Sequence, residues 1–329
     1  MAHTGEFDLI ERISARFDPA PEVTGIGDDC AVIPQKSGLD TLVTTDLLIE
    51  DRHFLLDDIS PEDLGWKSAA VNISDIAAMG GKAESAFLSI ALPPGTAAQW
   101  VDAFIGGFKA LSDRCGVVLL GGDTSASPDK LFINITLLGS CPHGKAVRRS
   151  GAREGDLVCV TGPLGDSAGG LKLILERSAR ARSEVSDPLP PSSGDACETL
   201  IRRHYRPEPK IAEGQRLAAL AGLHAMMDIS DGIASDLRHI LKASGVSAEI
   251  NLSDIPLSAE LLSICRSRGW DAGELAVSGG EDYELLFTMA PGTEPDIPYW
   301  PIGRIVRGNE GNIRWIGGNK TEYQGFTHF

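Results

Sequence analysis

Residues 117–123 of the chain are Val-Val-Leu-Leu-Gly-Gly-Asp, an apolar run that predicts a β-strand, followed by two glycines and a carboxylate. The same order, an apolar run and then an acidic turn, recurs along the chain. It is found at Ile26-Gly27-Asp28-Asp29, Leu42-Val43-Thr44-Thr45-Asp46, Met226-Met227-Asp228-Ile229-Ser230-Asp231 and Ala276-Val277-Ser278-Gly279-Gly280-Glu281-Asp282. A helical segment adds Asn72-Ile73-Ser74-Asp75. Strand-like runs that alternate with helical patterns predict an α/β or α+β fold.

Hydrophobic periodicity and turn residues give the positions of the other elements. In the first half we expect strands near 41–46, 84–92, 117–120 and 131–139, and helices over 6–16, 61–79 and 96–115. In the second half we expect strands near 157–161, 247–252, 284–289 and 302–306, and helices over 168–177, 209–221 and 233–243. Residues 178–195 are rich in Ser, Arg and Pro and predict a mobile surface loop.

The length of 329 residues favours two domains. A basic, glycine-rich stretch at 144–155 lies between the two halves, and it is where we expect the boundary. The prediction is an N-terminal domain over 1–145 and a C-terminal α/β domain over 146–329.

The charge and the cysteines exclude several classes of protein. A net charge of -16 argues against nucleic-acid and anionic-membrane partners, which need a basic surface. No apolar run approaches the ~20 residues that span a bilayer, and the N-terminus lacks the basic and apolar regions of a signal peptide. The 6 cysteines form no CxxC pair, which indicates buried thiols of a reducing cytosol. We therefore expect a cytoplasmic protein.

The acidic turns are the main chemical signal. If so many carboxylates converge, they repel one another unless a cation lies between them. Hard divalent cations such as Mg²⁺ take oxygen ligands and pair with phosphates. Such metals would also supply the positive charge that an acidic chain needs to bind a phosphate substrate. The arrangement predicts a site for phosphates and several metal ions.

Three familiar motifs are nearly matched. Residues 139–146 resemble a P-loop, but Ala146 lacks the hydroxyl that would hold Mg²⁺. Residues 25–30 lack the third glycine of a dinucleotide fingerprint. Gly165-Asp-Ser167-Ala-Gly169 matches the nucleophile elbow of serine hydrolases. A serine hydrolase that uses Ser167 is therefore an alternative function, with His224, His239 or His328 as its base, but it leaves the acidic turns unexplained.

Taken together, the motifs resemble one family over nearly the whole chain. They are GEFDLI, GIGDDCAV, TTDLLIEDRHF, KSAAVNISDIAAMGG, GGDTS, RRSGAREGD, TGPLGDSAGGL, MDISDGIASDL and SGGEDYELLF, in the order typical of thiamine-monophosphate kinases. That family belongs to a superfamily of ATP-using enzymes similar to aminoimidazole ribonucleotide synthetase. The resemblance implies transfer of the ATP γ-phosphoryl group to thiamine monophosphate. It also implies a homodimer whose N-terminal sheets pair into a barrel, with a C-terminal α/β domain beside each.

The resemblance also implies the roles of particular residues. Metal ligands would be Asp29, Thr44, Thr45, Asp46, Asp75, Asp123, Asp228 and Asp231. ATP would contact Gly122, Asp123, Arg149 and Ser230, and thiamine monophosphate would contact His53, Glu281 and Phe326. Phosphoryl transfer needs in-line positioning and charge neutralisation. Mg²⁺ ions held by Asp46, Asp75 and Asp123, together with the fixed positive charge of Arg149, would supply both.

Two further alternatives stay open at this point. A related ATP-using ligase of the same superfamily would share the acidic turns but not HF after the TTD block or SGGEDYEL. A catalytically silent binder of thiamine phosphates would retain the same pocket without turnover. We interpret three other acids, Asp28, Asp254 and Asp282, as turn or capping residues.

Overall fold

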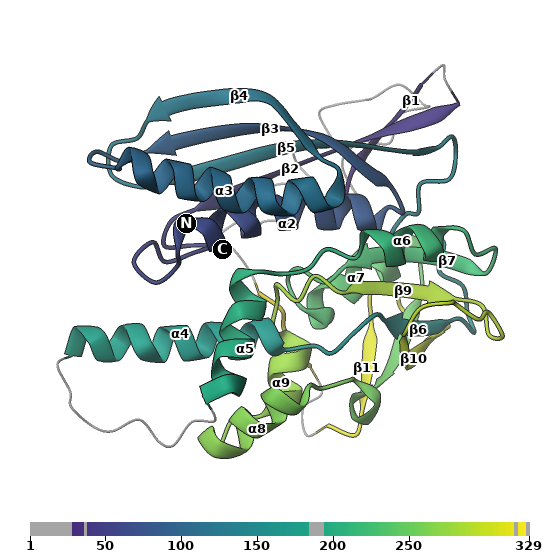
Figure 1. The fold of residues 1–329 in the computed structure, drawn as a ribbon. Helices are drawn as coiled ribbons and strands as arrows, with labels where there is room; N and C mark the ends of the chain where they lie inside the picture. Colours follow the sequence, from purple (N-terminus) through teal and green to yellow (C-terminus); the bar gives the residue numbers. More distant parts are fainter. Residues whose placement is uncertain (1–27, 36–37, 184–193, 319–321, 327–329) are drawn as a thin grey trace, which may run out of the picture.

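A computed structural model describes residues 28–35, 38–183, 194–318 and 322–326. The helix predicted over 6–16 and the glycines at 25 and 27 lie outside the described residues. Figure 1 shows two sheets, one in each half of the chain, with helices α2 and α3 beneath the first sheet on the side of the second half.

The first sheet has the strand order β1-β2-β5-β3-β4. Its strands are β1 (Ala31–Pro34), β2 (Leu39–Ile49), β3 (Lys82–Leu92), β4 (Val118–Ala126) and β5 (Phe132–Pro142). Neighbouring strands are antiparallel except β3 and β4, which are parallel. Buried and more exposed residues alternate along β5, because successive side chains point to opposite faces of a sheet. The buried face packs against α2 (Pro61–Ala78) and α3 (Ala98–Cys115).

Helix α2 lies at the centre of the molecule. The Ser60 hydroxyl caps its N-terminus by accepting a 3.1 Å hydrogen bond from the Asp63 N–H, and Pro61 occupies the first turn. The helix ends before Gly80, which has a φ of 69°. Most of its residues are buried, because it contacts the first sheet, α3 and elements of the second half. Side chains on α2 can therefore contact residues that are far away in the sequence.

The second sheet has the strand order β11-β8-β10-β6-β9-β7. Its strands are β6 (Leu157–Val160), β7 (Leu223–Asp228), β8 (Ser247–Asn251), β9 (Leu285–Met289), β10 (Trp300–Val306) and β11 (Ile313–Ile316). The helices of this half are α4 (Asp166–Ser183), α5 (Gly194–Tyr205), α6 (Ile211–Ala218), α7 (Ile233–Ser244), α8 (Ala259–Arg268) and α9 (Ala272–Ser278). A short 3₁₀-helix covers Leu252–Asp254.

The α/β prediction is confirmed, and most predicted elements lie within a few residues of the observed ones. Four details of the sequence prediction were wrong. Residues 178–183 continue α4 and residues 194–195 begin α5 rather than forming a loop, and Ala276-Val277 lies in helix α9 rather than in a strand. Asp46 and Asp123 lie within strands β2 and β4, not after them. Hydrogen bonding to neighbouring strands extends both strands past their apolar runs.

Candidate active site

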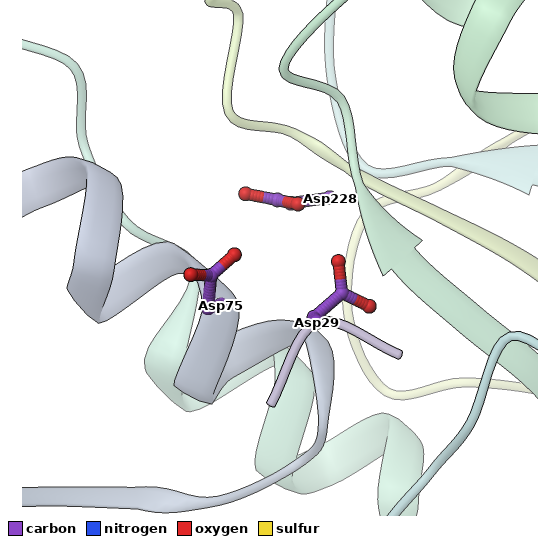
Figure 2. A group of neighbouring side chains, drawn as sticks. All are labelled: Asp29, Asp75 and Asp228. Atoms are coloured by element: carbon purple, nitrogen blue, oxygen red, sulfur yellow. The ribbon is translucent and has the colours of Figure 1, made fainter. Parts of the chain in front are cut away.

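Three carboxylates converge between the two halves of the chain. Asp29 comes from the segment just before β1, Asp75 from α2 and Asp228 from the end of β7. One carboxylate oxygen from each lies within 4.8 Å of those of the other two. Figure 2 shows the three side chains pointing toward a common centre. The structure thus brings together three of the acids that the sequence marks as metal ligands.

Each of these acids is oriented by a neighbouring group. The Thr44 hydroxyl donates a hydrogen bond to Asp75, and the Ser74 hydroxyl donates one of 2.5 Å to Asp228. Arg149 binds both oxygens of Asp29, through Nη2 at 2.8 Å and Nε at 3.3 Å. The carboxylates are therefore fixed before any cation binds.

The electrostatics of this cluster favour a cation. Burial and the Asp29 charge raise the pKa of Asp46 to about 6. Burial and Asp29 likewise raise the pKa of Asp228 to about 7, and burial with Asp46 raises the pKa of Asp75 well above its ordinary value. Arg149 supplies one positive charge beside these acids. Clustered hard oxygen donors whose negative charge is incompletely balanced fit a divalent cation such as Mg²⁺.

Two predicted ligands lie elsewhere. The Thr45 side chain lies on the other face of the first sheet, where its hydroxyl donates to the Ile135 carbonyl and accepts from Asn134. Asp123 is exposed on β4 and pairs with Ser89, two residues from the exposed Phe87.

Asp123 is also distant from the cluster. Asp46 pairs with Ile135, Ile135 with Leu88, and Leu88 with Gly122. The three inter-strand steps place Gly122, next to Asp123, roughly 14 Å from Asp46. Within one chain, Asp123 and Gly122 therefore do not join the acidic cluster.

A cavity of about 700 Å³ adjoins the acidic cluster and contains the other predicted residues. Its lining includes Asp46, His53, Ser230, Asp231, Glu281 and Phe326. Leu47, Leu171 and Leu175 add apolar surface to it. The three residues expected to contact the acceptor, from distant parts of the sequence, thus line one cavity that reaches the acids.

The ring of His53 is held by the main chain. Its Nδ1 accepts a 2.9 Å hydrogen bond from the Ile49 N–H. In a neutral imidazole the proton then lies on Nε2, which can donate to a ligand. His53 also lies close enough to Glu281 for their charges to interact.

Three residues missed by the sequence analysis belong to this region. Lys67 and His204 are buried, and both contact Glu281, at 2.9 Å and 3.3 Å. Asp236 is buried beside the acidic turn, and its carboxylate accepts a 3.2 Å hydrogen bond from the Asp231 N–H. Lys67 begins the motif KSAAVNISDIAAMGG, but nothing in that motif shows its partner, and His204 lies in none of the quoted motifs. Only the fold could show which residues they contact.

The geometry at Ser167 argues against a serine hydrolase. Its hydroxyl lies 2.9 Å from His204 Nδ1, a histidine that the sequence analysis did not propose as a base. The other ring nitrogen of His204 lies 3.4 Å from the Lys67 ammonium, which only donates, so Nε2 must accept and Nδ1 must carry the proton. A protonated Nδ1 cannot accept the proton of the Ser167 hydroxyl.

The other near-matches also have structural explanations. Where a P-loop would cradle phosphate, the Asp40 carboxylate accepts a 2.8 Å hydrogen bond from the Gly144 N–H. Asp28 accepts from the Arg149 N–H at 2.7 Å, and Asp282 accepts from the Gly165 and Ser167 N–H groups at 2.6 and 3.2 Å. Asp254 accepts from the Asn251 amide at 2.9 Å. Asp254 has the turn contact that we expected, and Asp282 accepts from N–H groups at the start of α4, as a capping acid does. Asp28 instead accepts from a backbone N–H 121 positions away in the sequence, which is not a turn contact.

The predicted burial of the cysteines is confirmed for five of the six. All six are free thiols, five of them buried and Cys115 partly so.

No helix in the described ranges is long and apolar enough to cross a membrane.

The chain is similar to known proteins over most of its length. It matches the AIR synthase related protein N-terminal domain over residues 27–141 and the AIR synthase related protein C-terminal domain over 153–316. A thiamine-monophosphate kinase of Bacillus subtilis is 40% identical over 286 residues, which are 87% of this chain and 83% of that protein. The Escherichia coli K12 enzyme of the same name is 38% identical over 344 aligned residues, covering 99% and 98%.

The chain is also similar to solved structures of thiamine-monophosphate kinases. One described as AaThiL complexed with AMPPCP and TMP superposes with a TM-score of 0.87 at 36% identity, over 100% of this chain and 98% of that one. The thiamine monophosphate kinase of Aquifex aeolicus gives a TM-score of 0.82 at 35% identity, over 98% and 99%.

Proposed function

The chain belongs to the thiamine-monophosphate kinase family, and on that premise we propose that it transfers the terminal phosphoryl group of ATP directly to thiamine monophosphate, giving thiamine diphosphate and ADP. The observation that carries the proposal is the continuity of the site. Asp46 lines the cavity and interacts electrostatically with Asp29 of the acidic cluster. An acceptor ring in the cavity would therefore present its phosphate to the acids.

Several Mg²⁺ ions are part of the proposal. The donor set is Asp29, Asp46, Asp75, Asp228 and Asp231, with Thr44 orienting Asp75. When bound, Mg²⁺ neutralises the negative charge of the two phosphate-bearing substrates. Thr45 can belong to this set only through its backbone, because its side chain lies on the other face of the sheet.

The residues of the chain position the reactants. The acceptor atom is a phosphate oxygen that is already ionised, so the reaction needs alignment rather than a general base. Arg149, which binds Asp29 in the structure, can pair with an ATP phosphate once cations occupy the acids. Ser230 also lines the cavity and can offer its hydroxyl to ATP.

The cavity suits the ring system of thiamine monophosphate. The Glu281 carboxylate can complement the cationic thiazolium or accept from the pyrimidine amine. Phe326, 47% exposed, can stack on an aromatic ring of the substrate. His53 can donate to a polar edge of the substrate. These contacts are what would distinguish thiamine monophosphate from other phosphate acceptors.

The proposal includes a homodimer that completes each site. Strand β4 is exposed along its whole length and forms one edge of the first sheet, with Val118 and Leu120 58% and 62% exposed. Phe87 on the neighbouring strand β3, and Leu47 on β2, add exposed apolar side chains. A second copy that covers this surface would bury them and bring the partner's Asp123 and Gly122 toward the acids.

Two further assignments belong to the same proposal. Residues 1–145 would bind the metals and form the dimer, and residues 146–329 would form the C-terminal domain, which contributes Asp228, Glu281 and Phe326. We place the protein in the cytoplasm, where both substrates of such a reaction would be available to it.

The test is direct conversion. Purified protein with ATP, thiamine monophosphate and Mg²⁺ should replace the single phosphate-monoester resonance of the acceptor with the two diphosphate resonances of thiamine diphosphate in ³¹P NMR. ADP should appear in equal amount. Release of inorganic phosphate from ATP without thiamine diphosphate would overturn the proposal.

A further inference from the structure

Lys67 is among the largest fully buried side chains in the described part of the chain. Its side chain is 1% exposed. A buried ammonium is costly unless it is paired and hydrogen-bonded. Its nearest acidic partner is Glu281, whose Oε2 lies 2.9 Å from Nζ. Lys67 comes from α2 and Glu281 from the turn before β9, so this ion pair joins the two halves of the chain inside the cavity region.

Both the backbone and the side chain of Glu281 are held in place by neighbouring residues. Its N–H donates a 2.7 Å hydrogen bond to the Ser230 carbonyl, and its φ is 62°, a conformation that non-glycine residues seldom adopt. Gly280 allows this close approach, because a Cβ there would lie 2.2 Å from the same carbonyl oxygen. Strained backbone of this kind persists where the surrounding structure imposes it, often at binding sites.

His204 completes the surroundings of the Glu281 carboxylate. Burial and the neighbouring Lys67 charge lower the pKa of His204 to about 3, so the ring is neutral. Its Nε2 accepts from Lys67, and its Nδ1 lies 2.9 Å from the Ser167 hydroxyl and 3.3 Å from Glu281 Oε2. The ring is therefore fixed between Lys67 and Ser167 and presents its N–H toward Glu281.

We infer that Lys67 and His204 are positioning residues that keep the Glu281 carboxylate ionised and oriented, so that it selects an acceptor with a hydrogen-bond donor, the amine of the aminopyrimidine ring. The inference rests on the proposed function, since it concerns how that acceptor is recognised. It adds Lys67 and His204 to the residues that determine specificity.

The second carboxylate oxygen of Glu281, Oε1, explains why the site would select an amine on the acceptor ring. Lys67 and His204 both contact Oε2, and among the described residues no hydrogen bond reaches Oε1. Burial raises the pKa of Glu281, but its neighbours, the Lys67 ammonium first among them, outweigh burial and the net shift is downward. An ionised carboxylate only accepts hydrogen bonds. It therefore binds an amine and repels a carbonyl oxygen at the same position.

The test compares thiamine monophosphate with its 4-oxo analogue, in which a carbonyl replaces the pyrimidine amine. Wild-type protein should prefer the amino substrate in kcat/KM by ~10²-fold or more, as a site built around one hydrogen bond does. In Lys67→Met, Glu281 loses the cation that keeps it ionised, and a protonated carboxyl can donate to the 4-oxo group. This variant should lower the preference at least ~10-fold, mainly through KM.

A matched control is Lys210→Met. Lys210 forms an ion pair of the same length, 2.9 Å, with the buried Glu284, three residues from Glu281, and neither residue lines the cavity. The control variant should keep the wild-type preference. A merely structural role for Lys67 would lower turnover of both substrates equally and leave the preference unchanged, which would overturn the inference.

If Lys67→Met does not fold, the double variant Lys67→Met/Glu281→Gln leaves no unpaired buried charge. The amide that this substitution introduces can donate to the 4-oxo group, so the preference should fall in the same way; an unchanged preference would overturn the inference. Failure of the proposed function is distinguishable, because wild-type protein would then convert neither substrate.

Discussion

The backbone N–H of Phe326 donates a 2.9 Å hydrogen bond to the carbonyl oxygen of Asp231. Gly325 packs closely at the same point, since a Cβ there would lie 2.6 Å from that oxygen. Tyr323 is buried, and its ring packs edge-on against Trp315 at 5.2 Å. These contacts attach the segment that carries Phe326 to the turn that carries Asp231. The ring that is expected to stack on the acceptor is therefore held at a fixed distance from an expected metal ligand.

Asp75→Asn should abolish turnover while the fold survives. Removing one anionic oxygen donor from a shared cation site should cost at least ~10²-fold in rate. The same change removes repulsion within the buried cluster, so the melting temperature of the metal-free protein should rise. Steady-state rates and thermal melts in EDTA check both effects.

The control for this variant is Asp254→Asn. Asp254 is an exposed acid that accepts hydrogen bonds from its own turn, far from the cavity lining. It should keep wild-type turnover and should not gain stability in EDTA. Near wild-type rates in Asp75→Asn would show that Asp75 does not bind a catalytic cation.

The stability of the metal-free protein should fall as pH rises. The pKa values of Asp46 and Asp228 are raised to about 6 and about 7 in the folded state. Groups with raised pKa values stabilise the fold below their ordinary pKa, and this contribution is lost as pH rises through the folded values. Mg²⁺ should restore the loss, so it should raise the melting temperature more at about pH 8 than at about pH 5. Equal shifts at both pH values would contradict this.

Ser167→Ala should leave kcat within about threefold of wild type, since its hydroxyl has no nucleophilic role in the proposed reaction. The hydroxyl contacts His204, so a modest rise in KM for thiamine monophosphate is the largest effect that we expect. A hydrolase would lose ~10⁴-fold or more. Covalent labelling of wild-type protein by a fluorophosphonate would contradict the assignment.

Mixing two inactive variants tests the shared site. Asp75→Asn and Asp123→Asn should each be inactive alone. After their subunits are exchanged, mixed dimers should have one intact site, composed of Asp75 from one chain and Asp123 from the other. If exchange is random, activity should recover to roughly one quarter of wild type, because half of the dimers are mixed. No recovery despite confirmed exchange would contradict a site shared across the dimer.

The sequence predicted the acids better than it predicted their surroundings. Asp29, Asp75 and Asp228 could be found because an acid after an apolar run, or within a distinctive helix motif, is a local signal. The different faces of Thr45 and Asp46 follow from strand alternation, but only once β2 is known to continue through both residues. The exposed position of Asp123 depends on β4 being an edge strand, which is a property of the whole sheet.

The partners of Glu281 also could not be predicted from the sequence. Lys67 lies in a helix whose apolar residues predict a buried face. From that pattern alone, a lysine is expected at the edge of the buried face, with its ammonium in solvent. Only the packing of α2 against the second half shows that the ammonium meets a carboxylate 214 positions away in the sequence. Pairings of that separation leave no periodic pattern in one sequence.

The measurement that tests the central claim most directly is a paired titration of Phe326→Ala, with Phe326→Tyr as the control that keeps an aromatic ring. ATP affinity is measured by calorimetry, and KM for thiamine monophosphate by steady-state kinetics. We predict that Phe326→Ala raises this KM by about 5- to 30-fold, as expected for one lost stacking contact of ~1–2 kcal/mol, and leaves ATP affinity within about twofold of wild type. Loss of ATP affinity with an unchanged KM for thiamine monophosphate would contradict the assignment of the cavity to the acceptor.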